Sequence, residues 1–108
     1  MGTNKKLAIL GATGSIGSST LDIVRRFPER YTISSLTAGR NVERLARQIE
    51  EFRPALAVVQ DEADRDRLRS LLPGDLDIEL LWGEAGLVAA AALPEVDMVV
   101  TGVVGAVG

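Results

Sequence analysis

Glycine recurs at every third position from Gly11 to Gly17, with Gly14 between them. A backbone without side chains can turn sharply and can approach a phosphate closely, which is the chemistry that a dinucleotide-binding turn needs. Gly11 would permit the turn, Gly14 would admit a pyrophosphate, and Gly17 would let a helix pack closely on a strand. The segment therefore predicts a phosphate-binding turn, with a glycine-rich turn that serves only packing as the alternative.

The residues between these glycines carry hydrogen-bond donors. Thr13 and Ser15 have hydroxyl groups, and the first backbone N–H groups of a helix have no partner within that helix. Such donors bind phosphates at helix N-termini. No Gly-Lys-Ser or Gly-Lys-Thr follows at the offset that a nucleoside triphosphate-binding loop requires. Hydrolysis of a nucleoside triphosphate is therefore disfavoured.

A second candidate site lies about twenty residues past the last glycine, where NAD-binding domains place an acidic residue for the ribose 2′-hydroxyl. This chain has Thr37-Ala-Gly-Arg-Asn41 there, without a carboxylate. Arg40 offers a forked, permanently charged donor that suits the additional phosphate of NADP. Asn41 could bind the same phosphate or only cap a helix, and Arg40 could simply be a solvated arginine.

Other features carry weaker signals. The glycine-rich segment from Gly102 to Gly108 follows the last predicted strand, where the nicotinamide half of a dinucleotide would run, although an ordinary turn is a comparable interpretation. Trp82 is expected to be a core or edge residue rather than a stacking platform. The acidic residues of the middle of the chain are expected to cap helices or face solvent and are assigned no metal: Asp61, Glu62, Asp64, Asp75, Asp77 and Glu79.

The composition excludes several classes of protein. The chain has 108 residues, 46% hydrophobic and 25% charged, with a net charge of −3 and neither cysteine nor histidine. This predicts one globular domain without a disulfide framework, a thiol nucleophile, a zinc–thiolate site or imidazole chemistry. Nucleic acid is not an expected partner, because there is no basic stripe. A membrane is not expected either, because no apolar run reaches spanning length, and a reducing, cytoplasmic location is expected.

Strand and helix patterns alternate along the chain. Short apolar or alternating runs predict strands at residues 6–10, 31–38, 55–59, 78–82 and 97–101. A helix is predicted in each interval, with Asn41 and Asp61 as N-caps of the second and third. The expected buried faces of the first three helices are Ile16, Thr20, Ile23, Val24 and Phe27; then Val42, Leu45, Ala46, Ile49 and Phe52; then Leu68, Leu71 and Leu72; the fourth helix is expected at Gly86–Leu93.

Strict alternation predicts the α/β class, with a Rossmann-like, doubly wound parallel sheet and helices on both faces. Ligands of such sheets bind beyond the carboxyl ends of the strands, where the strand order reverses, here next to the first strand. The first and fifth strands are apolar enough to be buried on both faces. Because the last residues look like the start of a further strand–helix loop, residues 1–108 are expected to be an incomplete dinucleotide-binding domain, the amino-terminal part of a larger protein.

The chain closely resembles the start of the 1-deoxy-D-xylulose 5-phosphate reductoisomerase family, from about residue 6 to the last residue. The resemblance is carried by Leu7-Ala-Ile-Leu-Gly-Ala-Thr-Gly-Ser-Ile-Gly17, Ser19-Thr-Leu-Asp-Ile-Val24, Pro28-Glu29, Ala38-Gly-Arg-Asn41 and Val103-Val-Gly-Ala106. Aspartate-semialdehyde dehydrogenases and extended short-chain reductases share only the Gly-Ala-Thr-Gly element. The chain departs from the family at Ala12, where the family often has serine, a change that should not disturb the turn.

The resemblance implies an NADPH-binding domain. The matching positions are Thr13, Gly14, Ser15 and Ile16 at the pyrophosphate, and Gly39, Arg40 and Asn41 around the adenosine 2′-phosphate. It further implies an enzyme of non-mevalonate isoprenoid biosynthesis that isomerises 1-deoxy-D-xylulose 5-phosphate and reduces the product with NADPH to 2-C-methyl-D-erythritol 4-phosphate. The full-length family uses a divalent metal, Mg or Mn, and a homodimer is expected. Its metal ligands and substrate-phosphate site come from later chain, so no catalytic or metal residue is assigned here.

Two other functions stay open at this stage. One is an NADP-binding regulatory module without catalysis, and the other is the cofactor domain of an oxidoreductase similar to aspartate-semialdehyde dehydrogenase. A folded scaffold without a ligand would follow if the glycines served only packing. A downstream Asn-Lys-Glu element with Asp and Glu ligands would indicate the reductoisomerase, whereas a cysteine nucleophile would indicate the dehydrogenase. The 108-residue chain alone is expected to bind NADPH without turnover and to self-associate through apolar surface near its last strand.

Overall fold

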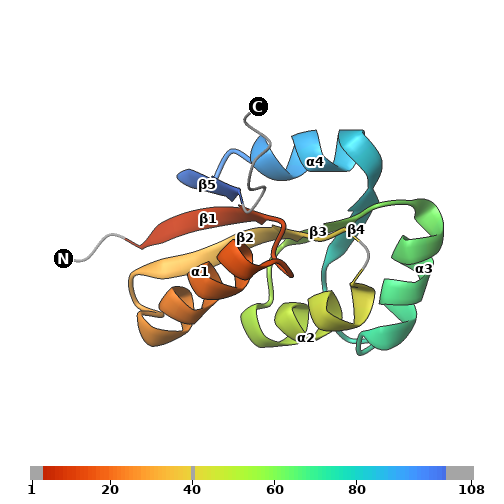
Figure 1. Ribbon diagram of the computed structural model, residues 1–108, viewed down its shortest axis with the longest axis horizontal. Coiled ribbons are helices and arrows are strands. Elements are labelled where there is room, and N and C mark those ends of the chain that lie inside the picture. The colour runs from red at the N-terminus through yellow and green to blue at the C-terminus, as the bar shows by residue number, and fades with distance from the viewer. Residues whose placement is uncertain (1–3, 40, 102–108) are drawn as a thin grey trace.

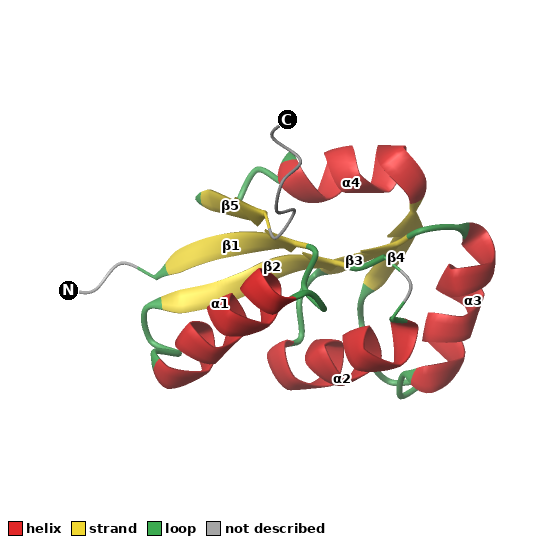
Figure 2. Cartoon of the chain, in the orientation of Figure 1, coloured by secondary structure: helices red, strands yellow, loops and turns green. Residues whose placement is uncertain are grey.

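The computed structural model describes residues 4–39 and 41–101, which form one sheet flanked by helices (Figure 1, Figure 2). The elements in chain order are β1 (Lys5–Leu10), α1 (Ser15–Arg26), β2 (Tyr31–Thr37), α2 (Val42–Phe52), β3 (Leu56–Val59), α3 (Glu62–Leu71), β4 (Glu79–Trp82), α4 (Gly83–Ala91) and β5 (Met98–Thr101). Strands and helices alternate as predicted. No helix in this part of the chain has the length and apolar character that crossing a membrane requires.

The sheet has five parallel strands in the order β4-β3-β2-β1-β5. The chain moves outward in one direction from β1 to β4 and then crosses back past β1 to β5. Right-handed crossovers place α1, α2 and α3 on one face and α4 on the other (Figure 1). This confirms the doubly wound, Rossmann-like sheet. The strand order reverses beside β1, which is where the sequence predicts a ligand site.

The main core lies between the sheet and the three helices on one face. Leu7 and Ile9 of β1 pack in one cluster with Leu21 of α1 and with Leu45 and Ile49 of α2, and all five are buried. Side chains alternate between the faces of a strand, and the intervening β1 residue is also buried. The prediction that β1 is buried on both faces is therefore confirmed.

A smaller core lies under α4 on the other face. Val58 of β3 packs there with Ala90 of α4, and the Ser35 hydroxyl of β2 donates to the Ala90 carbonyl at 3.3 Å. A Cβ added at Gly86 would lie 2.8 Å from Val58 Cγ1 and 3.1 Å from Leu81 Cβ. The missing side chain at Gly86 therefore allows α4 to approach the sheet closely.

The N-caps of α2 and α3 are confirmed. Asn41 Oδ1 accepts a hydrogen bond from the Arg44 backbone N–H at 3.1 Å, and Asp61 Oδ1 accepts one from the Asp64 backbone N–H at 2.9 Å. Each cap satisfies a backbone donor that the helix itself leaves unpaired, which typically contributes about 1 kcal/mol. The predicted apolar face of α2 is buried as well, with Phe52 only partly so.

The predicted buried face of α1 needs correction. The helix buries Gly17, Leu21 and Val24, whereas the predicted Ile16, Ile23 and Phe27 are 41%, 50% and 41% exposed. The physical reason is that the helix approaches the sheet at Gly17, so the positions one and two turns after that glycine face the core. The larger apolar residues lie on the flank of the helix.

The predictions for α3 and α4 also need correction. Leu68 is fully buried, but Leu71 is 41% exposed, because the chain leaves the helix at Leu72 in an extended conformation that carries Leu72, not Leu71, toward the core. The fourth helix spans Gly83–Ala91 rather than residues 86–93. Gly83 has a φ of +74°, which glycine tolerates, so the helix can start directly after β4.

Trp82 is an edge residue, one of the two places that the sequence predicts for it. It ends β4, an outer strand of the sheet, and is 38% exposed. The Arg65 guanidinium of α3 lies over its ring at 4.7 Å from the centroid. This contact covers part of the indole at the edge of the sheet.

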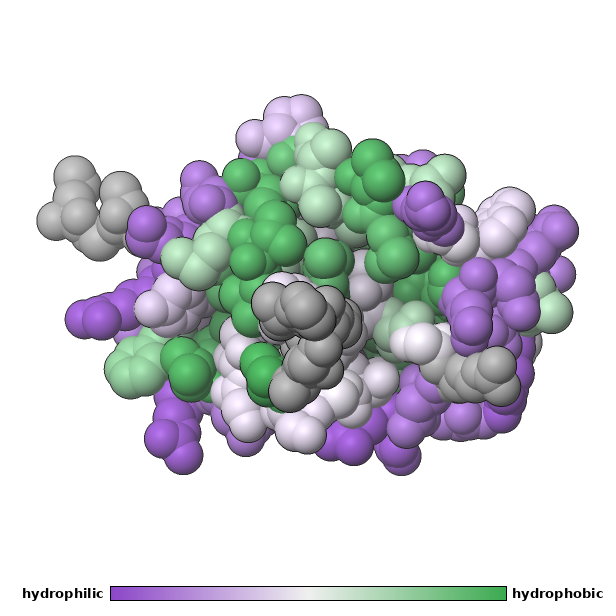
Figure 3. Space-filling view, turned by 45° about the horizontal axis from the view of Figure 1, so that its top comes forward, coloured by the Kyte–Doolittle hydropathy of each residue, from purple (hydrophilic) through white to green (hydrophobic). Residues whose placement is uncertain are grey.

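The prediction that β5 is buried on both faces is wrong. Met98 and Val99 point to opposite faces and are 47% and 44% exposed. In the described part of the chain β5 pairs only with β1, so it is an outer strand. Leu87 and Val88 of α4 are also exposed, and Figure 3 shows apolar side chains gathered on this side of the molecule. The expected apolar surface near the last strand is therefore present.

Replacement of Gly86 by alanine should lower the free energy of unfolding. The new methyl group must displace Val58 or Leu81, at a cost of about 1–3 kcal/mol, against a gain in helix propensity of about 1 kcal/mol at most. Gly74→Ala is the matched control, because a Cβ there meets nothing within 4 Å. Urea unfolding followed by circular dichroism measures both. Equal stability of the two variants would contradict the close approach of α4.

Candidate dinucleotide-binding site

The turn between β1 and α1 is closed by its own backbone. Gly11 has a φ of +78°, in the left-handed region that favours glycine. The Gly14 N–H donates to the Gly11 carbonyl at 3.0 Å, and the Ser18 N–H donates to the Gly14 carbonyl at 2.9 Å. Gly14 is the N-cap of α1. The turn thus leads directly from the carboxyl end of β1 into a helix N-terminus, as predicted.

The start of this helix presents unpaired donors. Within residues 4–39 and 41–101, the backbone N–H groups of Thr13, Ser15 and Ile16 donate to no acceptor. No side chain caps α1, because Gly14 occupies the N-cap, and the first turn contains no acidic residue. The helix dipole adds partial positive charge at the same place. This arrangement can bind an anion such as a pyrophosphate.

The three glycines of the turn differ in what they do for the fold. A Cβ at Gly17 would lie 2.4 Å from the Gly11 carbonyl oxygen and 2.7 Å from Ala12 Cα, so Gly17 is required for close packing. A Cβ at Gly14 would meet only the Gly11 carbonyl oxygen, at 3.4 Å, an ordinary contact. Gly14 therefore leaves open space that the fold itself does not need.

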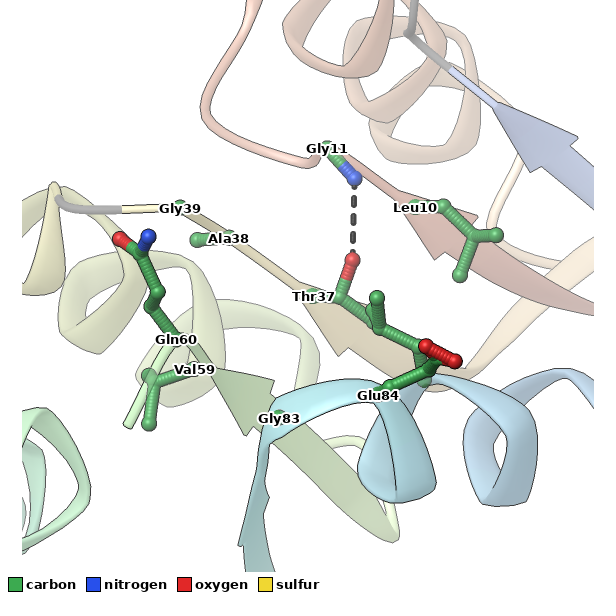
Figure 4. Close-up of a pocket in the computed structure, with 10 residues that line it drawn as sticks. Leu10, Gly11, Thr37, Ala38, Gly39, Val59, Gln60, Gly83 and Glu84 are labelled. Carbon is green, nitrogen blue, oxygen red and sulfur yellow. Dashed lines mark hydrogen bonds between the residues drawn. The ribbon is translucent and has the colours of Figure 1, made fainter. Parts of the chain in front are cut away.

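Two buried side chains hold the turn from neighbouring elements. Thr37, at the end of β2, accepts a hydrogen bond from the Gly11 N–H through Oγ1 at 3.0 Å (Figure 4). Its carbonyl accepts a second bond from the Ala12 N–H at 2.7 Å. From α2, Gln48 Nε2 donates to the Ala12 carbonyl at 3.0 Å. The turn is therefore fixed by β2 and α2 as well as by its own glycines.

The second predicted site follows β2, beside the turn. A Cβ at Gly39 would meet nothing within 4 Å, so this position is open. Asn41 caps α2 through Oδ1, while its amide nitrogen donates to no described residue. The cap role of Asn41 is thus confirmed, and its N–H₂ group can still donate to a ligand. Arg40 lies outside the described residues, as does the predicted nicotinamide segment Gly102–Gly108.

A pocket of about 520 Å³ opens at the carboxyl ends of β1, β2 and β3 (Figure 4). Its walls include Leu10, Val59 and Leu87, and its polar groups include Gln60 after β3 and Glu84 in the first turn of α4. Gly11 and Gly39 of the two predicted sites border the same pocket. A volume of this size with apolar walls and a few polar groups is typical of small-ligand sites.

Arg44 adds positive charge beside the turn. It is exposed in the first turn of α2, and one guanidinium nitrogen donates to Ser18 Oγ of α1 at 3.2 Å. Farther along the same two helices, Arg25 forms an ion pair with Glu51 that lowers the pKa of the Glu51 carboxyl, mainly through the hydrogen bond from Arg25. This pair is exposed, so it contributes little to stability.

Sequence reasoning missed several of these residues. Thr37 and Gln48 contact the turn only through the three-dimensional arrangement, although a polar Gln48 beside the apolar stripe of α2 was a usable signal. Gln60 and Glu84 follow different strands, and their position at the carboxyl ends of a parallel sheet was a signal for pocket residues.

The described residues do not provide a metal site. They contain no group of three or more carboxylate, histidine or cysteine side chains placed to hold an ion. Asp61 caps α3, and the acidic residues Glu62 and Asp64 lie in the first turn of that helix. We therefore assign no metal ligand among residues 4–39 and 41–101.

Comparison with known proteins identifies the family. Residues 7–108 match the family model described as 1-deoxy-D-xylulose 5-phosphate reductoisomerase. The chain belongs to this reductoisomerase family. The reductoisomerase of Chlorobaculum tepidum is 55% identical over 104 residues, which are 96% of this chain and 27% of that protein. The Trichlorobacter lovleyi reductoisomerase is 53% identical, over 96% of this chain and 26% of its own length.

Solved reductoisomerases share the fold. A DOX-P reductoisomerase in complex with NADPH, fosmidomycin and magnesium is 40% identical and superposes with a TM-score of 0.82, over 88% of this chain and 23% of that one. The chain thus spans about a quarter of the length of the reductoisomerases that it matches. The comparison confirms the family and the Rossmann-like fold that the sequence predicts.

Replacement of Gly17 by alanine should destabilise the fold more than replacement of Gly14 by alanine. The methyl group at position 17 must push α1 away from the turn, because backbone atoms lie 2.4–2.9 Å from it and cannot rotate aside. We expect a loss of about 1–3 kcal/mol or more, and less than about 1 kcal/mol for Gly14→Ala. Thermal and urea unfolding measure both variants. A Gly17→Ala variant as stable as the Gly14→Ala variant would contradict the close contact.

Proposed function

We propose that this chain is the NADPH-binding portion of a 1-deoxy-D-xylulose 5-phosphate reductoisomerase. The observation that carries the proposal is the row of N–H groups at Thr13, Ser15 and Ile16, which find no acceptor among the described residues and lie beside a glycine that the fold leaves open. These donors suit the pyrophosphate of a dinucleotide. The solved relative that contains NADPH supports the choice of dinucleotide.

The geometry beside the turn supports a proposal for where the adenosine and the 2′-phosphate of the cofactor bind. The pocket bordered by Leu10, Val59 and Leu87 suits the adenosine, because it offers apolar walls for a base and polar groups at its rim. The 2′-phosphate would lie at residues 39–41, with Gly39 giving access, Asn41 donating from its amide nitrogen and Arg40 supplying charge. These three residues make the site selective for NADPH over NADH.

The activity of the whole enzyme is part of the proposal. When bound, NADPH supplies a hydride to an aldehyde, and the product would be 2-C-methyl-D-erythritol 4-phosphate, made from 1-deoxy-D-xylulose 5-phosphate through an isomerisation and a reduction. This chain contributes binding and orientation of the cofactor. We propose a cytoplasmic homodimer that uses a divalent metal, with the sugar phosphate and metal bound by residues other than those assigned here.

The comparisons favour this function over the two alternatives. The family match runs through residues 7–108, well beyond the Gly-Ala-Thr-Gly element that aspartate-semialdehyde dehydrogenases share. A regulatory NADP-binding module would also present the same turn. The reductoisomerase names of the relatives at 53–55% identity support an enzyme instead.

Replacement of Arg40 by alanine should weaken the binding of NADPH far more than the binding of NADH. Only NADPH has the 2′-phosphate with which a guanidinium can form a charge-assisted hydrogen bond, so we expect a loss of about 1.5–3 kcal/mol for NADPH and almost none for NADH. Isothermal calorimetry with each cofactor measures the difference. Equal losses of binding free energy for NADPH and NADH would show that Arg40 does not bind the 2′-phosphate.

Replacement of Gly14 by valine should abolish NADPH binding while the chain stays folded. The branched side chain would fill the space that the pyrophosphate needs, whereas the fold offers a Cβ at this position only one ordinary contact. Circular dichroism and calorimetry on the same sample decide the outcome. Unfolding together with loss of binding would favour the interpretation that the glycines serve only packing. Tight NADPH binding by a folded variant would show that the pyrophosphate does not bind at Gly14.

A further inference from the structure

Gln48 has a buried side-chain amide whose nitrogen and oxygen differ in their hydrogen bonding. The residue is 8% exposed, and Nε2 donates to the Ala12 carbonyl at 3.0 Å. A carbonyl oxygen can only accept, so the amide nitrogen must face Ala12. Oε1 is then directed elsewhere and, in the described part of the chain, finds no donor although it is buried. An apolar side chain of the same size would avoid the cost of that unpaired oxygen.

The bond to Ala12 controls the direction of a donor in the turn. The Ala12 carbonyl and the Thr13 N–H belong to one planar trans peptide unit, in which the two groups point in opposite directions. Holding the carbonyl toward buried Gln48 therefore holds the Thr13 N–H away from α2. The preceding peptide is already fixed, because the Ala12 N–H donates to the Thr37 carbonyl at 2.7 Å. The Gln48 bond fixes the one that follows.

We propose that Gln48 is a positioning residue for cofactor binding. It keeps the Ala12–Thr13 peptide in the orientation that presents the Thr13 N–H, together with those of Ser15 and Ile16, to the pyrophosphate. Without this bond the peptide can rotate, and the first donor of the row is lost. The inference rests on the proposed NADPH function, and it assigns to α2 a role in binding in addition to packing.

The test compares Gln48→Leu and Gln48→Glu with the unaltered chain, using NADP⁺ as the probe in calorimetry from pH 5 to pH 8. Leucine fills the volume but donates nothing, so affinity should fall roughly tenfold or more at every pH. A protonated glutamic acid at position 48 can donate its O–H to the Ala12 carbonyl, whereas a carboxylate cannot and would face the carbonyl dipole. Burial raises the pKa of such a carboxyl. Affinity of Gln48→Glu should therefore be near normal at pH 5 and fall as the pH rises.

Other titrating groups do not mimic this profile. The charged groups around position 48 are Asp22 and Arg25 on α1 and Arg44, Arg47 and Glu51 on α2, and all are present in every sample. The chain has no histidine. Phosphate monoesters titrate near pH 6, but the 2′-phosphate of NADP⁺ affects variant and unaltered chain alike, so their affinity ratio removes its contribution.

Glu50→Gln is the matched control. This substitution replaces a carboxylate by an amide on the exposed side of α2. The affinity of this variant for NADP⁺ should therefore equal that of the unaltered chain at each pH. Circular dichroism at each pH confirms that the compared samples are folded, and the Gln48→Glu profile remains decisive if Gln48→Leu fails to fold. A Gln48→Glu affinity ratio that does not change with pH would overturn the inference. Absence of NADP⁺ binding by the unaltered chain would instead overturn the proposed function.

Discussion

The backbone of α1 touches the backbone of the preceding turn at Gly17, and most of the site depends on that contact. Any side chain at this position would place its Cβ within 2.4 Å of the Gly11 carbonyl oxygen. The contact sets the rotation of α1, so that Leu21 and Val24 enter the core. It also fixes where the first N–H groups of the helix lie relative to the end of β1. The same constraint therefore determines both a packing face and a row of ligand donors.

The topology of the sheet supplies the surroundings of that row. Because β2 lies beside β1, Thr37 can bond the turn through both its side chain and its backbone. Because the crossover from β4 to β5 carries α4 over the opposite face, Glu84 and Leu87 come to line a pocket with the ends of β1 and β3. The candidate site is therefore assembled from elements that a parallel, doubly wound sheet must bring together at its carboxyl edge.

Interactions between residues close in the sequence were predictable, whereas contacts between residues far apart in the sequence were not. Asn41 and Asp61 cap their helices because a cap needs only a side-chain oxygen and a nearby N–H. Helical periodicity found apolar residues on α1, but it could not tell that Ile16 and Ile23 lie beside the face that contacts the sheet. The burial of β5 depends on what lies next to it in space. Gln48 was missed because its bond to Ala12 spans 36 residues of sequence.

The structure explains how the turn accommodates Ala12, at the position where the resemblance leads us to expect serine. Ala12 is completely buried, so its side chain points into the interior rather than toward the phosphate-binding side of the turn. What the position contributes to the site is its backbone, with the N–H bonded to Thr37 and the carbonyl bonded to Gln48. A serine hydroxyl there would lie in the core and would need a partner of its own. Alanine removes that requirement while both backbone bonds remain, so the turn keeps its geometry without the hydroxyl.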